Sequence, residues 1–143
     1  MRLSVTTPRG ALVDTDVEEL TAPGQLGEFG VLPGHVPLMS ALKPGVLTYR
    51  SANHTGVLAV GEGFLQVAPS GPEGALVDRV LVLVDHAANA TAVDHQAAAK
   101  ELARLEAEIT AWKQDLDGTY KALIVRRDWA LAQINAAARL NPS

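Results

Sequence analysis

The residues most able to bind a metal ion are scattered along this chain. Its four histidines neither form the i, i+4 pair of a helical metal site nor belong to a recognisable ligand cluster; they are His35, His54, His86 and His95. The sequence contains no cysteine, which excludes disulfides, thiolate zinc sites and cysteine nucleophiles. We therefore expect no metal site.

Other motifs that could do chemistry are incomplete. The acidic run DTDVEEL at residues 14–20 alternates carboxylates, but it lacks the glycine and the terminal glutamate of a calcium-binding loop. A phosphate-binding loop requires a following Lys-Ser/Thr pair and the start of a helix. The GEG triplet at residues 61–63 is followed by neither. No serine lies in a nucleophile-elbow context. The sequence therefore does not predict an independent enzyme.

The composition is that of one domain, or of a small domain with an appendage. The 143 residues are 48% hydrophobic and 20% charged, which allows a packed core and argues against global disorder. The first ten residues lack the apolar core of a secretory signal, and no stretch approaches the ~20 apolar residues that span a bilayer. We expect a soluble protein that contacts a membrane only through partners.

The formal net charge of −4 is unevenly distributed. Residues 1–118 hold 8 basic and 15 acidic side chains, a net of −7, whereas residues 119–143 have a net of +3. The field of the acidic part would repel phosphates, so we expect no nucleic-acid partner. The basic end could bind an acidic surface.

Short segments interrupted by Gly or Pro dominate the first 90 residues and predict a β-sandwich or barrel. Within them Val and Leu alternate with polar side chains, the pattern of a strand with one buried face. The expected strands cover residues 2–6, 11–20, 45–50, 56–60, 63–68 and 75–84.

Beyond residue 90 only one glycine and one proline occur, and the pattern becomes helical. Apolar residues recur at steps of three and four along one helical face, comprising Ala98, Leu102, Leu105, Ile109, Trp112 and Leu116. We expect Thr91 to cap this helix, with Asp94 in its first turn, and the Asp-Gly pair at 117–118 to end it. A second helix over about residues 120–140 would complete an antiparallel hairpin.

The second helix carries two adjacent apolar stripes, although its helical partner can cover only one. One stripe comprises Val125, Trp129, Ala132, Ala136 and Leu140, and the other Leu123, Leu131, Ile134 and Ala138. Either the uncovered stripe packs on the strand-rich part, or it serves another protein or an alternative position of the helix.

Residues 24–50 read GQLGEFGVLPGHVPLMSALKPGVLTYR, and this segment resembles the signature of the epsilon subunit of the F-type ATP synthase, the counterpart of the mitochondrial delta subunit. The matching positions are Gly27, Glu28, Gly30, Leu32, Pro33, Gly34, His35, Pro37, Leu38, Leu42, Lys43, Pro44 and Gly45. The segments GEGFLQV at 61–67 and VLVLVDHAANA at 80–90 resemble later strands of that family.

The resemblance implies an α+β fold, with an N-terminal β-sandwich over residues 1–88 and a regulatory antiparallel two-helix hairpin over residues 89–143. It implies a non-catalytic central-stalk subunit that couples the membrane rotor ring to the catalytic head and modulates ATP hydrolysis through the hairpin. Its partners would be the gamma subunit of the stalk, the rotor ring and the catalytic-head subunits, at the cytoplasmic face of the bacterial plasma membrane. The alternative is a free-standing β-sandwich binding module with a regulatory helical hairpin.

The signature segment supplies the first candidate site. Prolines and glycines would make a rigid loop that displays Glu28 and His35. The resemblance implies that this loop meets the rotor ring. The alternative is a purely structural turn, above all for His35, whose imidazole could satisfy buried backbone groups.

Three arginines of the second helix, Arg126, Arg127 and Arg139, form the second candidate site, because their own helix offers only Asp128 as a partner. One interpretation is that they pair with acids of the first helix, namely Glu101, Glu106, Glu108 and Asp115. The other is that they reach an acidic segment of the catalytic head when the hairpin extends.

Some bacterial members of the family carry a nucleotide motif at the start of the first helix, with an aliphatic residue, Asp, two variable residues, Arg and Ala. Here Asp94 is present, but Ala97 stands at the position of the arginine. Without that cation to face phosphate, we expect weak or no ATP binding, and no cofactor.

Overall fold

The structure is a computed structural model that describes residues 1–34, 36–69, 71–72 and 78–140. Along this part of the chain the strands precede the helices. The strands are β1 (Arg2–Thr7), β2 (Gly10–Asp16), β3 (Glu19–Gly24), β4 (Gly27–Val31), β5 (Leu38–Leu42), β6 (Gly45–Arg50), β7 (Thr55–Val60), β8 (Gly63–Ala68), β9 (Arg79–Val84) and β10 (Ala87–Asn89). A short 3₁₀ turn, η1 (Ala90–Ala92), leads to α1 (His95–Thr110) and α2 (Gly118–Leu140).

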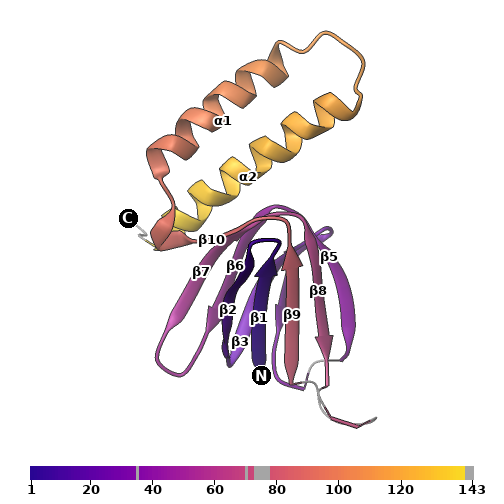
Figure 1. The fold of residues 1–143 in the computed structure, drawn as a ribbon, viewed down its shortest axis with the longest axis vertical. Coiled ribbons are helices and arrows are strands. Elements are labelled where there is room, and N and C mark those ends of the chain that lie inside the picture. The colour runs from indigo at the N-terminus through magenta and orange to yellow at the C-terminus, as the bar shows by residue number, and fades with distance from the viewer. Residues whose placement is uncertain (35, 70, 73–77, 141–143) are drawn as a thin grey trace.

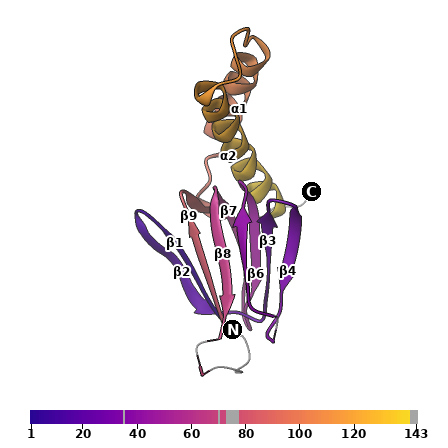
Figure 2. The same cartoon turned by 90° about the vertical axis from the view of Figure 1, so that its right-hand side faces the viewer.

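The strands form one hydrogen-bonded sheet that folds over on itself at β3. The strand order is β10-β7-β6-β3-β5-β8-β9-β1-β2, and β4 pairs with β3. Residues 19–21 of β3 pair with β6, whereas Gly24 at its end pairs with Leu42 of β5. The two parts of the sheet therefore face each other as a sandwich, as Figures 1 and 2 show. The expected β-sandwich followed by a helical hairpin is confirmed.

The core lies between the two layers and follows the period-two alternation of the strands. In β9, for example, Val80, Val82 and Val84 point inward and are almost completely buried. On the neighbouring β8, Leu65 and Val67 are buried in the same cluster. Branched aliphatic side chains therefore provide most of the core.

Strands β6 and β7 are buried on both faces, because α2 covers their outer face. Leu47, Leu58 and Val60 point into the sandwich core. Val46, Val57 and Ala59 point outward and form a second cluster with η1 and with the end of α2. In Figures 1 and 2 the hairpin accordingly projects from one end of the sandwich, with only the C-terminal half of α2 beside the strands.

Four of the expected strands agree to within one residue with β1, β6, β7 and β8. The single strand expected over 11–20 is wrong, since the chain turns at residues 17–18 between β2 and β3. There the amides of Val17 and Glu18 donate to the carbonyls of Met1 and Arg50, each at 2.7 Å. The strand expected over 75–84 begins at Arg79 as β9, and residues 75–77 lie outside the described residues.

The helical face predicted for α1 is correct as far as Ile109, but both predicted helix ends are wrong. Thr91 lies in η1, and Asp94 is the N-cap of α1, accepting from the amide of Ala97 at 3.0 Å. Helix α1 ends at Thr110, and the carboxylate of Asp117 instead caps α2 by accepting from Thr119 and Tyr120. An aspartate oxygen accepts from free helical amides, so the Asp-Gly pair begins a helix here rather than ending one. Neither α1 nor α2 combines the length and apolar character that a membrane span needs.

Candidate interaction sites

The first candidate site is the hairpin of β3 and β4, which carries Glu28. Gly24 pairs with Gly27 across a two-residue turn, so Leu26 stands fully exposed at its tip. Gly27 has φ of +130°, and a Cβ on Gly24 would lie 2.8 Å from the Gly27 carbonyl oxygen. Only glycine fits this turn without strain, which explains why the hairpin is narrow and well defined.

Glu28 sits opposite Pro23 on this hairpin and is half exposed. Its Oε2 accepts from Nη2 of Arg139, near the end of α2, at 3.2 Å. The structure therefore joins two residues that the sequence assigns to different partners. His35, the other residue expected to meet the ring, lies outside the described residues.

A shallow groove of about 620 Å³ runs between the end of α2 and the strands beside this ion pair. It is lined by Glu28 and Arg139 and also by Pro23, Lys43, Pro44, Gly45, Val46, Asn135 and Ala138. Polar and small residues thus separate the last turns of α2 from the β3–β4 hairpin.

The other two arginines of α2 are also paired in this conformation. Nη2 of Arg126 lies 2.9 Å from Oε1 of Glu101 on α1, as the interpretation of pairing with the first helix expects. Arg127 contacts its neighbour Asp128 at 3.0 Å and does not reach α1. The three arginines consequently point to three different places rather than forming one cluster.

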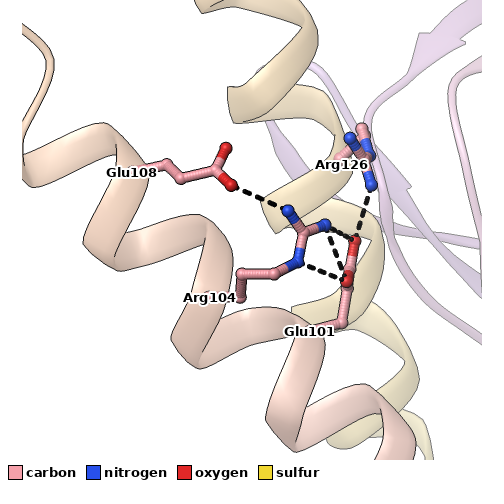
Figure 3. Close-up of polar contacts among 4 residues, drawn as sticks. All are labelled: Glu101, Arg104, Glu108 and Arg126. Atoms are coloured by element: carbon pink, nitrogen blue, oxygen red, sulfur yellow. Dashed lines mark hydrogen bonds and ion pairs between the residues drawn. The ribbon is translucent and has the colours of Figure 1, made fainter.

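Glu101 is the centre of the charged network between the two helices. Figure 3 shows its carboxylate between Arg104 and Arg126, with Glu108 contacting Arg104 from the next turn of α1. The hydrogen bonds from Arg104 are the main reason why the pKa of Glu101 lies below its usual value. The same pairing raises the pKa of Arg104.

The other side of α2 faces the sheet with small side chains. Ala132 and Ala136 are buried against Val46, Val57 and Ala59. A large contact comes from Trp129, whose ring stacks on His86 with centroids 5.4 Å apart. Of the second apolar stripe, Leu123 is buried whereas Leu131 is 40% exposed, so the stripe is only partly covered.

Sequence reasoning missed an exposed apolar patch on the layer opposite α2. Met39, Phe64 and Leu83, on β5, β8 and β9, are 67%, 56% and 47% exposed. Together with Leu81 and Gln66 they line a depression of about 280 Å³. The signal was the uninterrupted apolar run at residues 80–84, because a strand with a solvated outer face would alternate with polar residues.

The nucleotide and metal motifs find no further support. The Oδ1 of Asp94 is engaged by the amide of Ala97, which is its capping role. No group of three or more His, Cys, Asp or Glu side chains suitable for a metal ion occurs among the residues that the structure describes.

Comparisons with known proteins place these features in a family. Residues 1–90 match the family model described as "ATP synthase, Delta/Epsilon chain, beta-sandwich domain". The ATP synthase epsilon chain 2 of Syntrophotalea carbinolica is 35% identical over 139 residues, which cover 97% of this chain and 94% of that relative.

The fold recurs in solved mitochondrial assemblies. A chain in the Euglena gracilis ATP synthase structure of OSCP, F1 and c-ring superposes with a TM-score of 0.76 at 20% identity, over 94% of this chain and 79% of that one. A chain in the central stalk and c-ring structure of the Tetrahymena thermophila ATP synthase gives 0.62 at 17% identity, over 96% of both chains. These two structures support the fold.

Proposed function

Because the chain belongs to the delta/epsilon family of ATP synthase, as a non-catalytic epsilon subunit, we propose that its sandwich attaches to the central stalk and its helical hairpin regulates ATP hydrolysis. The observation that carries this is the extent of the likeness. The epsilon-chain relative matches across the sandwich and both helices, with 97% of this chain covered. A free-standing binding module would not require the helices to match as well.

The patch of exposed Met39, Phe64 and Leu83, with half-buried Leu81 beside them, is the surface we assign to the stalk, with the gamma subunit as its partner. Large apolar side chains exposed side by side on neighbouring strands are typical of a protein interface. Helix α2 already covers β6 and β7, whereas the outer face of β5, β8 and β9 is open. The hairpin can therefore move without disturbing this attachment.

Glu28 and the tip of its hairpin are proposed to face the rotor ring. The support is a rigid turn that holds Leu26 and Glu28 out from the sandwich. Ring contact would place the chain on the membrane side of the complex, at the cytoplasmic face in a bacterium. His35 stays a prediction of the resemblance.

Arg126, Arg127 and Arg139 are proposed to contact the catalytic head when the hairpin extends. Each arginine is paired within the chain in the present conformation. When the hairpin extends, the ion pair between Arg139 and Glu28 must therefore break, and each residue must find a new partner on another subunit. Exposed ion pairs stabilise by only about 0–1 kcal/mol each, so such an exchange is energetically accessible. Nucleotide binding is not part of the proposal.

The attachment is tested by replacing Phe64 with Glu and measuring co-purification with the gamma subunit. A charge forced into an apolar interface should lower the recovery more than about tenfold. Leu116→Glu is the matched control, because Leu116 is 70% exposed in the segment between the helices. Recovery of folded Phe64→Glu at the level of the control would contradict the assignment of this face.

A further inference from the structure

The contact between Glu28 and Arg139 joins residues 111 positions apart and ties the last turns of α2 to the β3–β4 hairpin. It matters because, apart from Trp129, α2 is buried against the sheet mainly through alanine side chains. Alanine methyls bury little apolar area, so Ala132 and Ala136 hold the helix much less firmly than leucines would.

The end of α2 is not sealed against the strands. The groove beside the ion pair is open to water, and on the α2 side it is lined by Asn135, Ala138 and Arg139 rather than by large apolar groups. Beyond Ala136, within the described residues, Arg139 connects this helix to the β3–β4 hairpin through its ion pair with Glu28. That ion pair therefore biases the position of the helix end, in addition to the packing of α2 on β6 and β7.

We propose that the ion pair between Glu28 and Arg139 is a latch on α2, because Glu28 cannot bind Arg139 and the rotor ring at the same time. This rests on the proposed function, in which Glu28 faces the rotor ring. Because a carboxylate forms its strongest contacts with a cation, the partner that we assign to Glu28 on the ring is a cationic side chain, which would compete with Arg139. When that cation takes Glu28, Arg139 loses its counter-ion, and the end of α2 is released from the sandwich.

Through the latch, binding of Glu28 to the ring would change how firmly the hairpin is docked on the sandwich. Attachment of the sandwich to the stalk uses the opposite layer and leaves the latch intact. Engagement of Glu28 by the ring frees Arg139, whose charge then becomes available to an acidic surface. An exposed ion pair shifts an equilibrium by roughly two- to fivefold, which makes the device adjustable and sensitive to salt.

The first arm of the test uses the isolated chain. With Trp112 changed to Phe, Trp129 is the sole tryptophan, and its stacking on His86 makes its emission a reporter of docked α2. Glu28→Gln and Arg139→Gln should each raise the released fraction roughly two- to fivefold, and the double variant should match either single one. Arg127→Gln is the control, because it removes equal charge but breaks only the pair with Asp128. Equal emission in all variants would overturn the latch.

The second arm measures binding to a subcomplex of stalk subunit and rotor ring that lacks the catalytic head. Arg139→Gln should bind roughly two- to fivefold more tightly than the parent, because Glu28 is freed, whereas Glu28→Gln should bind more weakly. If the parent binds and Arg139→Gln binds equally, the latch is wrong while the proposed function stands. If the parent itself does not bind, the proposed function is wrong.

Discussion

At the scale of single residues, the charges of the hairpin act as local pairs. Glu101 accepts from Arg104 on its own helix and from Arg126 on α2, so one carboxylate helps to hold the two helices together. The Glu28–Arg139 pair does the same between α2 and the sandwich. Both pairs are exposed, so each contributes little alone and both weaken with salt.

The shift of Glu101 predicts a pH dependence. Its pKa in the folded chain lies below the ordinary value of 4.5, so its stabilising effect is present above that value and is lost as the pH falls through the folded pKa. Glu101→Gln should lower the thermal midpoint of the helical hairpin slightly near neutral pH, and the difference from the parent should disappear once the pH has fallen through the lowered pKa of Glu101.

Thermal circular dichroism at a series of pH values measures this effect. Glu106→Gln is the matched control, since Glu106 lies on the same helix and forms no ion pair with any residue that the structure describes. A pH-independent difference between Glu101→Gln and the parent would contradict the assignment.

At the scale of elements, the interface of α2 with β6 and β7 is close-packed around alanines. Ala136 is completely buried there, whereas Ala103 on α1 is exposed. Overpacking such a position costs about 1–3 kcal/mol. Ala136→Leu should therefore weaken docking of the hairpin by about that amount in urea unfolding followed by Trp129 fluorescence.

Ala103→Leu makes the same change at an exposed helical position and should leave the unfolding midpoint almost unchanged. If Ala136→Leu is as stable as this control, the helix does not pack on the strands as the structure has it.

The elements also show which features of the fold are visible in the sequence. Alternation predicted β6, β7 and β8, and the three-four periodicity predicted the inner face of α1. The strands β3, β4 and β5 were not predicted as such. Pro23 and the glycines interrupt the alternation in β3 and β4, and β5 is only five residues long. The Asp-Gly pair at 117–118 was assigned to the wrong helix end, because aspartate can serve a turn or a cap.

The contacts at the candidate sites differ in how far the sequence could predict them. Pairing of Arg126 with α1 follows from the predicted hairpin, because it needs only two neighbouring helices. The contact of Arg139 with Glu28 could not be predicted from the sequence, since it depends on where α2 packs against the sandwich.

At the scale of the whole molecule, the chain combines a sandwich with its own core and a hairpin attached at one end. Strand β10, Ala87–Asn89, pairs with β7 at the edge of the sheet, and the division into a sandwich over residues 1–88 and a hairpin over residues 89–143 stays a prediction. Removing the hairpin would expose Val46 and Val57 but leave the core between the layers intact. The sandwich should therefore fold and attach by itself.

The most direct test is ATP hydrolysis by the assembled complex that carries this chain truncated after Ala90. The account predicts that the truncated chain incorporates as fully as the complete one, because the apolar patch on β5, β8 and β9 is retained. Hydrolysis should then be faster than with the complete chain, because the regulatory hairpin is gone. Unchanged hydrolysis at full incorporation would contradict the regulatory role of the hairpin, and failure of the folded sandwich to incorporate would contradict its role as the attachment.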